Sequence, residues 1–277
     1  MSKYYVLNIK LDSEFRKGPE AYIEIMNKLY KEKVLINIRN NKQVSIRRIL
    51  DFKFDDYVYI TGKIFKCTKL ENNDWIDIQK LESIDMEIPE NIYPNFEEND
   101  FFFIPNAHRL CIPKNGKVSI TATRDFFLKA LNQVVNDKEA VSVFIEQSQD
   151  IYEKILNAKY INNLLIKLTP TNDDINDEAV EFMDQQIKEM QAGEVNIKVK
   201  PNSKGKLSLS SSVLNGCLGL AKSNGEVTAN IINQNDKKEK IITQDHPKEL
   251  EVSSKKEEKI EISIFKKVMN TFRKAKY

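Results

Sequence analysis

The stretch D-F-F-F-I-P-N-A-H-R-L-C-I-P-K, residues 100–114, indicates the fold most directly, because it reads as two strands joined by a turn. Residues 101–104 form an apolar run, and residues 105–107 supply turn-forming proline and asparagine. Residues 108–112 then form a second apolar run. We therefore predict a β-hairpin whose phenylalanines lie in a hydrophobic core.

The same stretch carries His108 and Cys111, which suggest nucleophilic catalysis at first sight. Residues three apart on one strand point to opposite faces of the sheet, so these two side chains are not expected to share a proton. The three cysteines, Cys67, Cys111 and Cys217, are odd in number and lie in apolar runs. We expect buried thiols in a reducing compartment rather than disulfides.

On both sides of this hairpin, strand patterns alternate with helix patterns. In residues 57–68, β-branched and aromatic residues alternate around Gly62, which predicts a strand. Thr123 is the expected N-cap of an amphipathic helix that carries Phe126 and Phe127. Within the helical run at residues 207–222, Gly216 and Gly219 suggest close packing of another element.

These patterns predict an α+β protein with two portions, each a mixed or antiparallel sheet with packed helices. The length of 277 residues allows two domains. We place an N-terminal α+β domain at residues 1–140 and a C-terminal α+β domain at residues 141–252. Residues 253–277 are predicted to be a basic, partly disordered tail with an amphipathic helix, carrying eight Lys or Arg against three Glu from position 255.

Composition excludes several classes of protein. The formal net charge of +2 creates no global field, so binding to nucleic acid requires local basic patches. The N-terminal residues lack the apolar core of a signal peptide, and no apolar stretch is long enough to span a membrane. We expect a soluble, cytoplasmic protein without integral membrane association.

No complete catalytic or cofactor site emerges from the sequence. Neither glycine-rich nucleotide-binding motif is present, and the two histidines, His108 and His246, have no partner at metal-ligand spacing. The acidic run at residues 169–178 has two readings: it binds Mg²⁺, or it caps a helix. The residues in question are Asp173, Asp174, Asp177 and Glu178. We predict no cofactor and no metal, and we favour a non-enzymatic role over an enzymatic one.

Short cationic stretches are the remaining candidates for function. Lys198 and Lys200 alternate along one strand face, which suggests a ridge that contacts phosphates. A solvated strand edge protected by lysines is the alternative. The candidate nucleic-acid-binding residues are Arg47, Arg48, Lys114, Lys117, Arg124, Lys198, Lys200, Lys204, Lys206, Lys266, Lys267, Arg273 and Lys274.

Four segments, taken in order, resemble a bacterial family of unknown function found among phage-defence genes. They are I-P-E-N-I-Y-P-N-F, F-F-F-I-P-N-A-H-R-L-C-I, L-L-I-K-L-T-P-T-N-D-D and Q-D-H-P-K-E-L-E-V. A looser similarity of layout connects the chain to phage exclusion proteins of the RexA type. That similarity implies a homodimer that binds DNA without strong sequence preference.

The leading hypothesis is a non-enzymatic, DNA-binding homodimer in antiviral defence, acting with a partner protein of the defence system. A metal-dependent nuclease or other toxic effector enzyme using Asp173, Asp174 and Asp177 is the first alternative. A protein-interaction subunit that docks through its C-terminal helix is the second.

Overall fold

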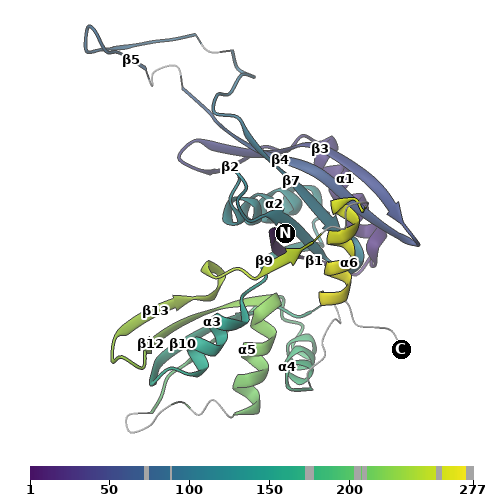
Figure 1. The fold of residues 1–277 in the computed structure, drawn as a ribbon, viewed down its shortest axis with the longest axis vertical. Helices are drawn as coiled ribbons and strands as arrows, with labels where there is room; N and C mark the ends of the chain where they lie inside the picture. The colour runs from purple at the N-terminus through teal and green to yellow at the C-terminus, as the bar shows by residue number, and fades with distance from the viewer. Residues whose placement is uncertain are drawn as a thin grey trace.

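The computed structural model describes residues 1–71, 75–87, 89–171, 178–202, 207, 211–253 and 258–272. Helices pack on antiparallel sheets, which confirms the predicted α+β class. Figure 1 shows the larger sheet above the smaller one, with a thin hairpin extending from the top of the molecule.

The first sheet is antiparallel, curled and eight-stranded in the described part of the chain. Its strand order is β14-β1-β8-β7-β4-β3-β2, and β9 also pairs with β1. The strands are β1 (Ser2–Asp12), β2 (Ile36–Arg39), β3 (Lys42–Phe54), β4 (Tyr57–Thr68), β7 (Glu97–Ile104), β8 (Arg109–Pro113), β9 (Ala140–Ile145) and β14 (Glu249–Val252).

Both faces of this sheet are covered. The helices α1 (Pro19–Lys31) and α2 (Ile120–Val134) bury one face, and α6 (Ile260–Phe272) packs on part of the other. In Figure 1, α6 crosses in front of the sheet while α2 lies behind it. The centre of the sheet is therefore inaccessible to solvent, and its edges and uncovered corners carry the exposed side chains.

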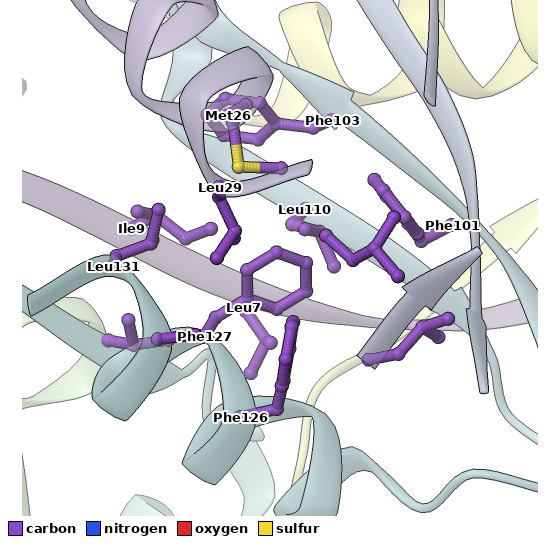
Figure 2. Packing of buried hydrophobic residues seen from close by; sticks show 14 of the residues in the cluster. Leu7, Ile9, Met26, Leu29, Phe101, Phe103, Leu110, Phe126, Phe127 and Leu131 are labelled. Atoms are coloured by element: carbon purple, nitrogen blue, oxygen red, sulfur yellow. The ribbon is translucent and has the colours of Figure 1, made fainter. Parts of the chain in front are cut away.

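The quoted stretch forms the predicted hairpin at the centre of this sheet. β7 and β8 pair through Phe102↔Cys111 and Phe103↔Leu110, and the 3₁₀ turn Pro105–Ala107 joins them. Phe101 and Phe103 enter the core under α1 and α2, as Figure 2 shows, whereas Phe102 faces α6. The three consecutive phenylalanines thus stabilise the packing on both faces of the sheet.

The second sheet has the order β11-β10-β12-β13, also antiparallel. Its strands are β10 (Tyr160–Leu168), β11 (Val195–Val199), β12 (Gly225–Ile232) and β13 (Lys238–Ile242). One face is buried by α3 (Gln149–Leu156) and α5 (Ser212–Asn224), and α4 (Glu178–Glu189) packs on α5. A Cβ atom at Gly216 would lie 2.4 Å from the carbonyl oxygen of Ala179, which confirms close packing at this glycine.

The boundary placed at residue 140 falls in front of a strand of the first sheet. β9 pairs with β1 through Leu7↔Ile145 to Asp12↔Ala140, and β14 pairs with β1 at Ser2↔Val252. The first sheet is therefore completed by one strand that precedes the second sheet in the sequence and by one that follows it. Residues 146–245 hold the second sheet and its helices between those two strands.

The C-terminal helix is docked on its own chain. In α6, Ile264, Phe265 and Val268 are buried against the first sheet, and the Phe265 ring lies 5.5 Å from that of Phe54. The apolar face that a partner-docking helix would need is therefore occupied within the described residues.

A small hairpin lies apart from both sheets. β5 (Trp75–Asp77) pairs with β6 (Glu82–Ile84), and Figure 1 shows this hairpin extending away from the body. Asp77 accepts hydrogen bonds from the backbone amides of Gln79 (2.9 Å) and Lys80 (3.2 Å), which fixes the turn.

Candidate nucleic-acid interface

The outer face of the second sheet is uncovered in the described part of the chain. The inner face buries Leu164, Ile166 and Ala229 in the second hydrophobic core. Their neighbours along the strands, such as Leu165 and Thr228, point the other way and are exposed or half-buried. The sheet thus offers an antiparallel surface that is open to solvent on one side.

Strand register arranges the side chains of this face in rows. One row contains Lys198, Leu165, Thr228 and Ile242, each directly opposite the next across neighbouring strands. The next row contains Asn163, Asn230 and Lys240. The Asn230 amide donates a hydrogen bond of 3.0 Å to the Asn163 side-chain oxygen, which links the two side chains across the neighbouring strands.

Lysines border the face on both sides. Lys198 and Lys200 lie at the β11 edge, and Lys238 and Lys240 lie at the β13 edge, all four exposed. None of the four forms an ion pair with a residue that the structure describes, whereas Lys167 pairs with Glu194 at 2.6 Å. Because three strand spacings separate the edges, the two rows of charge lie about 14 Å apart.

Four other predicted cations are neutralised by carboxylates. The pairs are Arg47–Glu98 at 2.7 Å, Arg124–Asp125 at 2.6 Å, Lys266–Glu258 at 2.6 Å, and Lys114 with Glu249. Hydrogen bonds from Lys114 and Lys3 hold the pKa of the Glu249 carboxyl below its usual value. These contacts leave little charge for phosphates at these positions.

Arg48, Lys117 and Lys267 are exposed but lie apart, on β3, in the loop between β8 and α2, and on α6. They do not join the face of the second sheet. Lys204, Lys206, Arg273 and Lys274 lie outside the described residues, as do Asp173, Asp174 and Asp177 of the acidic run. Of the predicted cations, the structure brings together Lys198 and Lys200.

Sequence reasoning did not identify Lys238 and Lys240. Their spacing, K-E-K, repeats the K-V-K spacing of Lys198 and Lys200, and this alternation was the available signal. What the sequence did not show is that the two strands form opposite edges of one sheet.

The histidine and cysteine of the central hairpin point to opposite faces, as predicted. The His108 ring stacks on Tyr22 of α1, with centroids 4.7 Å apart. Cys111 is buried on the face of α6, and burial raises the pKa of its thiol to about 12. A thiol with that pKa remains protonated near neutral pH, so Cys111 does not supply a nucleophile.

Among the residues that the structure describes, no three His, Cys, Asp or Glu side chains lie close enough together to hold a metal ion. No helix among them is long and apolar enough to cross a lipid bilayer.

The family model described as "Domain of unknown function (DUF4747)" matches residues 2–270 of the chain. No curated protein matches the sequence of the chain.

Proposed function

This chain belongs to the DUF4747 family, and we propose that it binds DNA without strong sequence preference through the outer face of its second sheet. The observation that carries the proposal is the pair of lysine rows at the β11 and β13 edges, which border an open face of polar and apolar side chains and form no ion pairs with described residues. The proposed setting, antiviral defence in the cytoplasm with a partner protein, rests on the resemblance of motifs.

The face suits contact with a phosphate backbone. Lysine ammonium groups at both edges attract phosphates and release their counterions. The centre carries Asn163, Asn230 and Thr228, whose amide and hydroxyl groups donate to and accept from any base. Few features of the face distinguish one base from another, which is why we propose binding without strong sequence preference.

A charge-reversal pair tests the role of the face. The variant Lys198→Glu with Lys240→Glu should weaken DNA binding at least about tenfold and reduce the salt slope of log K by roughly 2, because two phosphate contacts are lost. Binding is measured by fluorescence anisotropy from low to moderate salt, with single-stranded and double-stranded DNA in parallel.

The matched control is Lys31→Glu with Lys53→Glu, which changes the net charge equally at exposed lysines outside the face. This control should bind nearly as the natural chain does. A natural chain that binds neither form of DNA at low salt contradicts the proposal. Equal weakening in both double variants also contradicts it, because binding would then follow net charge alone.

A further inference from the structure

The hairpin arm, defined as residues 75–87, exposes an unusual amount of apolar surface. Ile78 is 74% exposed and Leu81 is 75% exposed. Ile76, Ile84 and Met86 are also exposed along the same arm. An isolated two-stranded hairpin is marginally stable in water, so an arm with these side chains gains stability by covering them.

The arm and the residues that follow it, up to position 96, are acidic. Residues 75–96 contain five of the 41 Asp and Glu of the chain but one of its 43 Lys and Arg. A phosphate backbone is repelled by such a surface. The arm is therefore suited to a protein surface that is both basic and apolar.

A surface of that kind lies at the base of the arm. Arg39 on β2 lies opposite Lys42 on β3, and Lys42 lies opposite Thr68 on β4. Lys69 follows at the end of β4. The three cations form no ion pair with a described residue and are exposed. We call these three residues of the first sheet the basic corner.

Beside the basic corner lies a hollow of about 290 Å³. Its apolar lining comes from Leu35, Phe65, Cys67, Tyr93 and Phe96, with Glu90 and Asn91 at its rim. The hollow is large enough to receive the branched apolar side chains of a hairpin tip. One chain thus carries both an acidic, apolar projection and a basic, apolar recess next to its root.

We propose that the arm binds a second copy of this chain. The two arms lie side by side and antiparallel, so that Ile78 and Leu81 of each copy enter the hollow of the other. Glu82 and Asp85 then face the basic corner of the partner copy. Two-fold symmetry forms both contacts at once, because the arm of each copy binds the hollow of the other. The assembly is therefore a closed dimer that adds no further copies.

Charge complementarity favours this occupant and this direction. A parallel arrangement would place acidic tips against each other and basic corners against each other. The antiparallel arrangement alternates the signs along the contact. The inference does not rest on DNA binding, because the arm and the face of the second sheet share no residue.

The mass of the full-length chain in solution tests the proposal. At micromolar concentration, light scattering should give twice the chain mass of 32.2 kDa. The variant Ile78→Asp with Leu81→Asp should shift it to the mass of one chain. Both positions are exposed, and aspartate tolerates the positive φ of 56° at Leu81, so folding is preserved.

The control Phe182→Asp with Met190→Asp changes exposed apolar residues at α4 and should leave the dimer intact. Arg39→Glu with Lys42→Glu should weaken the dimer at least tenfold, and adding Glu82→Lys with Asp85→Lys to the same chain should restore it. A natural chain that is monomeric, or a dimer that survives the Ile78 and Leu81 changes, overturns the proposal. Failure of the four-site charge swap to restore the dimer overturns the antiparallel arrangement.

Discussion

The hydrophobic core of the first sheet has no room for a side chain at Gly62. A Cβ atom there would lie 2.2 Å from Cζ of Phe101 and 2.7 Å from the carbonyl oxygen of Arg48. Both neighbours are held in the sheet, because Gly62 lies directly opposite Ile49 and Phe101 on the adjacent strands. We expect Gly62→Ala to lower the free energy of unfolding by about 1–3 kcal/mol through overpacking.

Urea unfolding followed by circular dichroism measures this change. Gly193→Ala is the matched control, because a Cβ atom at Gly193 meets nothing within 4 Å. The control should stay within about 0.5 kcal/mol of the natural chain. Equal stability of the two variants would show that the Phe101 ring moves aside at no cost.

Residue patterns predicted which side chains are buried better than which charges are paired. The burial of Phe101 and Phe103 follows from the apolar strand run, so the sequence was sufficient there. His108 was expected to begin the second strand, but it lies in the turn before β8 with a φ of 55°, so the turn sets the direction of its ring. The partners of Arg47 and Lys114 are Glu98 and Glu249, both distant in sequence. Such ion pairs depend on strand order, which local patterns do not specify.

At the scale of elements, the docking of α6 leads to a second prediction. Phe265 is buried between Phe54, Tyr57 and Tyr59, with ring centroids between 5.5 and 6.1 Å from each. We expect Phe265→Ala to cost about 3–5 kcal/mol, as for a large side chain removed from a core. The measurement is again urea unfolding of the full chain.

Lys267→Ala on the exposed side of α6 is the control and should cost little, since Lys267 contacts solvent. If the Phe265 change were as mild as this control, the helix would not stabilise the sheet. Increased protease cleavage within α6 in the Phe265 variant, but not in the Lys267 variant, would show that the lost stability is lost at the helix.

Element boundaries were less predictable than the elements themselves. Thr123 was expected to cap α2, yet the helix begins after Ser119, whose side chain accepts a hydrogen bond from the Ala122 amide. Thr123 lies one turn inside, fully buried, and donates to the Ser119 carbonyl oxygen at 2.9 Å. Both residues are good caps, and tertiary burial of Thr123 decides between them.

At the scale of the whole molecule, the two sheets are joined by buried polar contacts. Asn8 of β1 donates to the Ser223 carbonyl oxygen at 2.9 Å, and its own side-chain oxygen accepts from Arg109 at 2.7 Å. Arg109 forms an ion pair of 2.8 Å with Glu146, which accepts a hydrogen bond from the Ser223 hydroxyl at 2.9 Å. The partners come from distant parts of the chain, so only the folded topology reveals the set.

This arrangement predicts that the two sheets unfold together because of Arg109. Arg109→Met leaves the buried Glu146 carboxylate without its cation and should cost about 3–5 kcal/mol. Calorimetry should then resolve two transitions where the natural chain shows one. Adding Glu146→Gln removes the stranded charge while keeping an acceptor for Ser223, so this double variant should recover much of the loss. A single variant costing under about 1 kcal/mol, with one transition retained, would show that apolar contacts alone couple the two sheets.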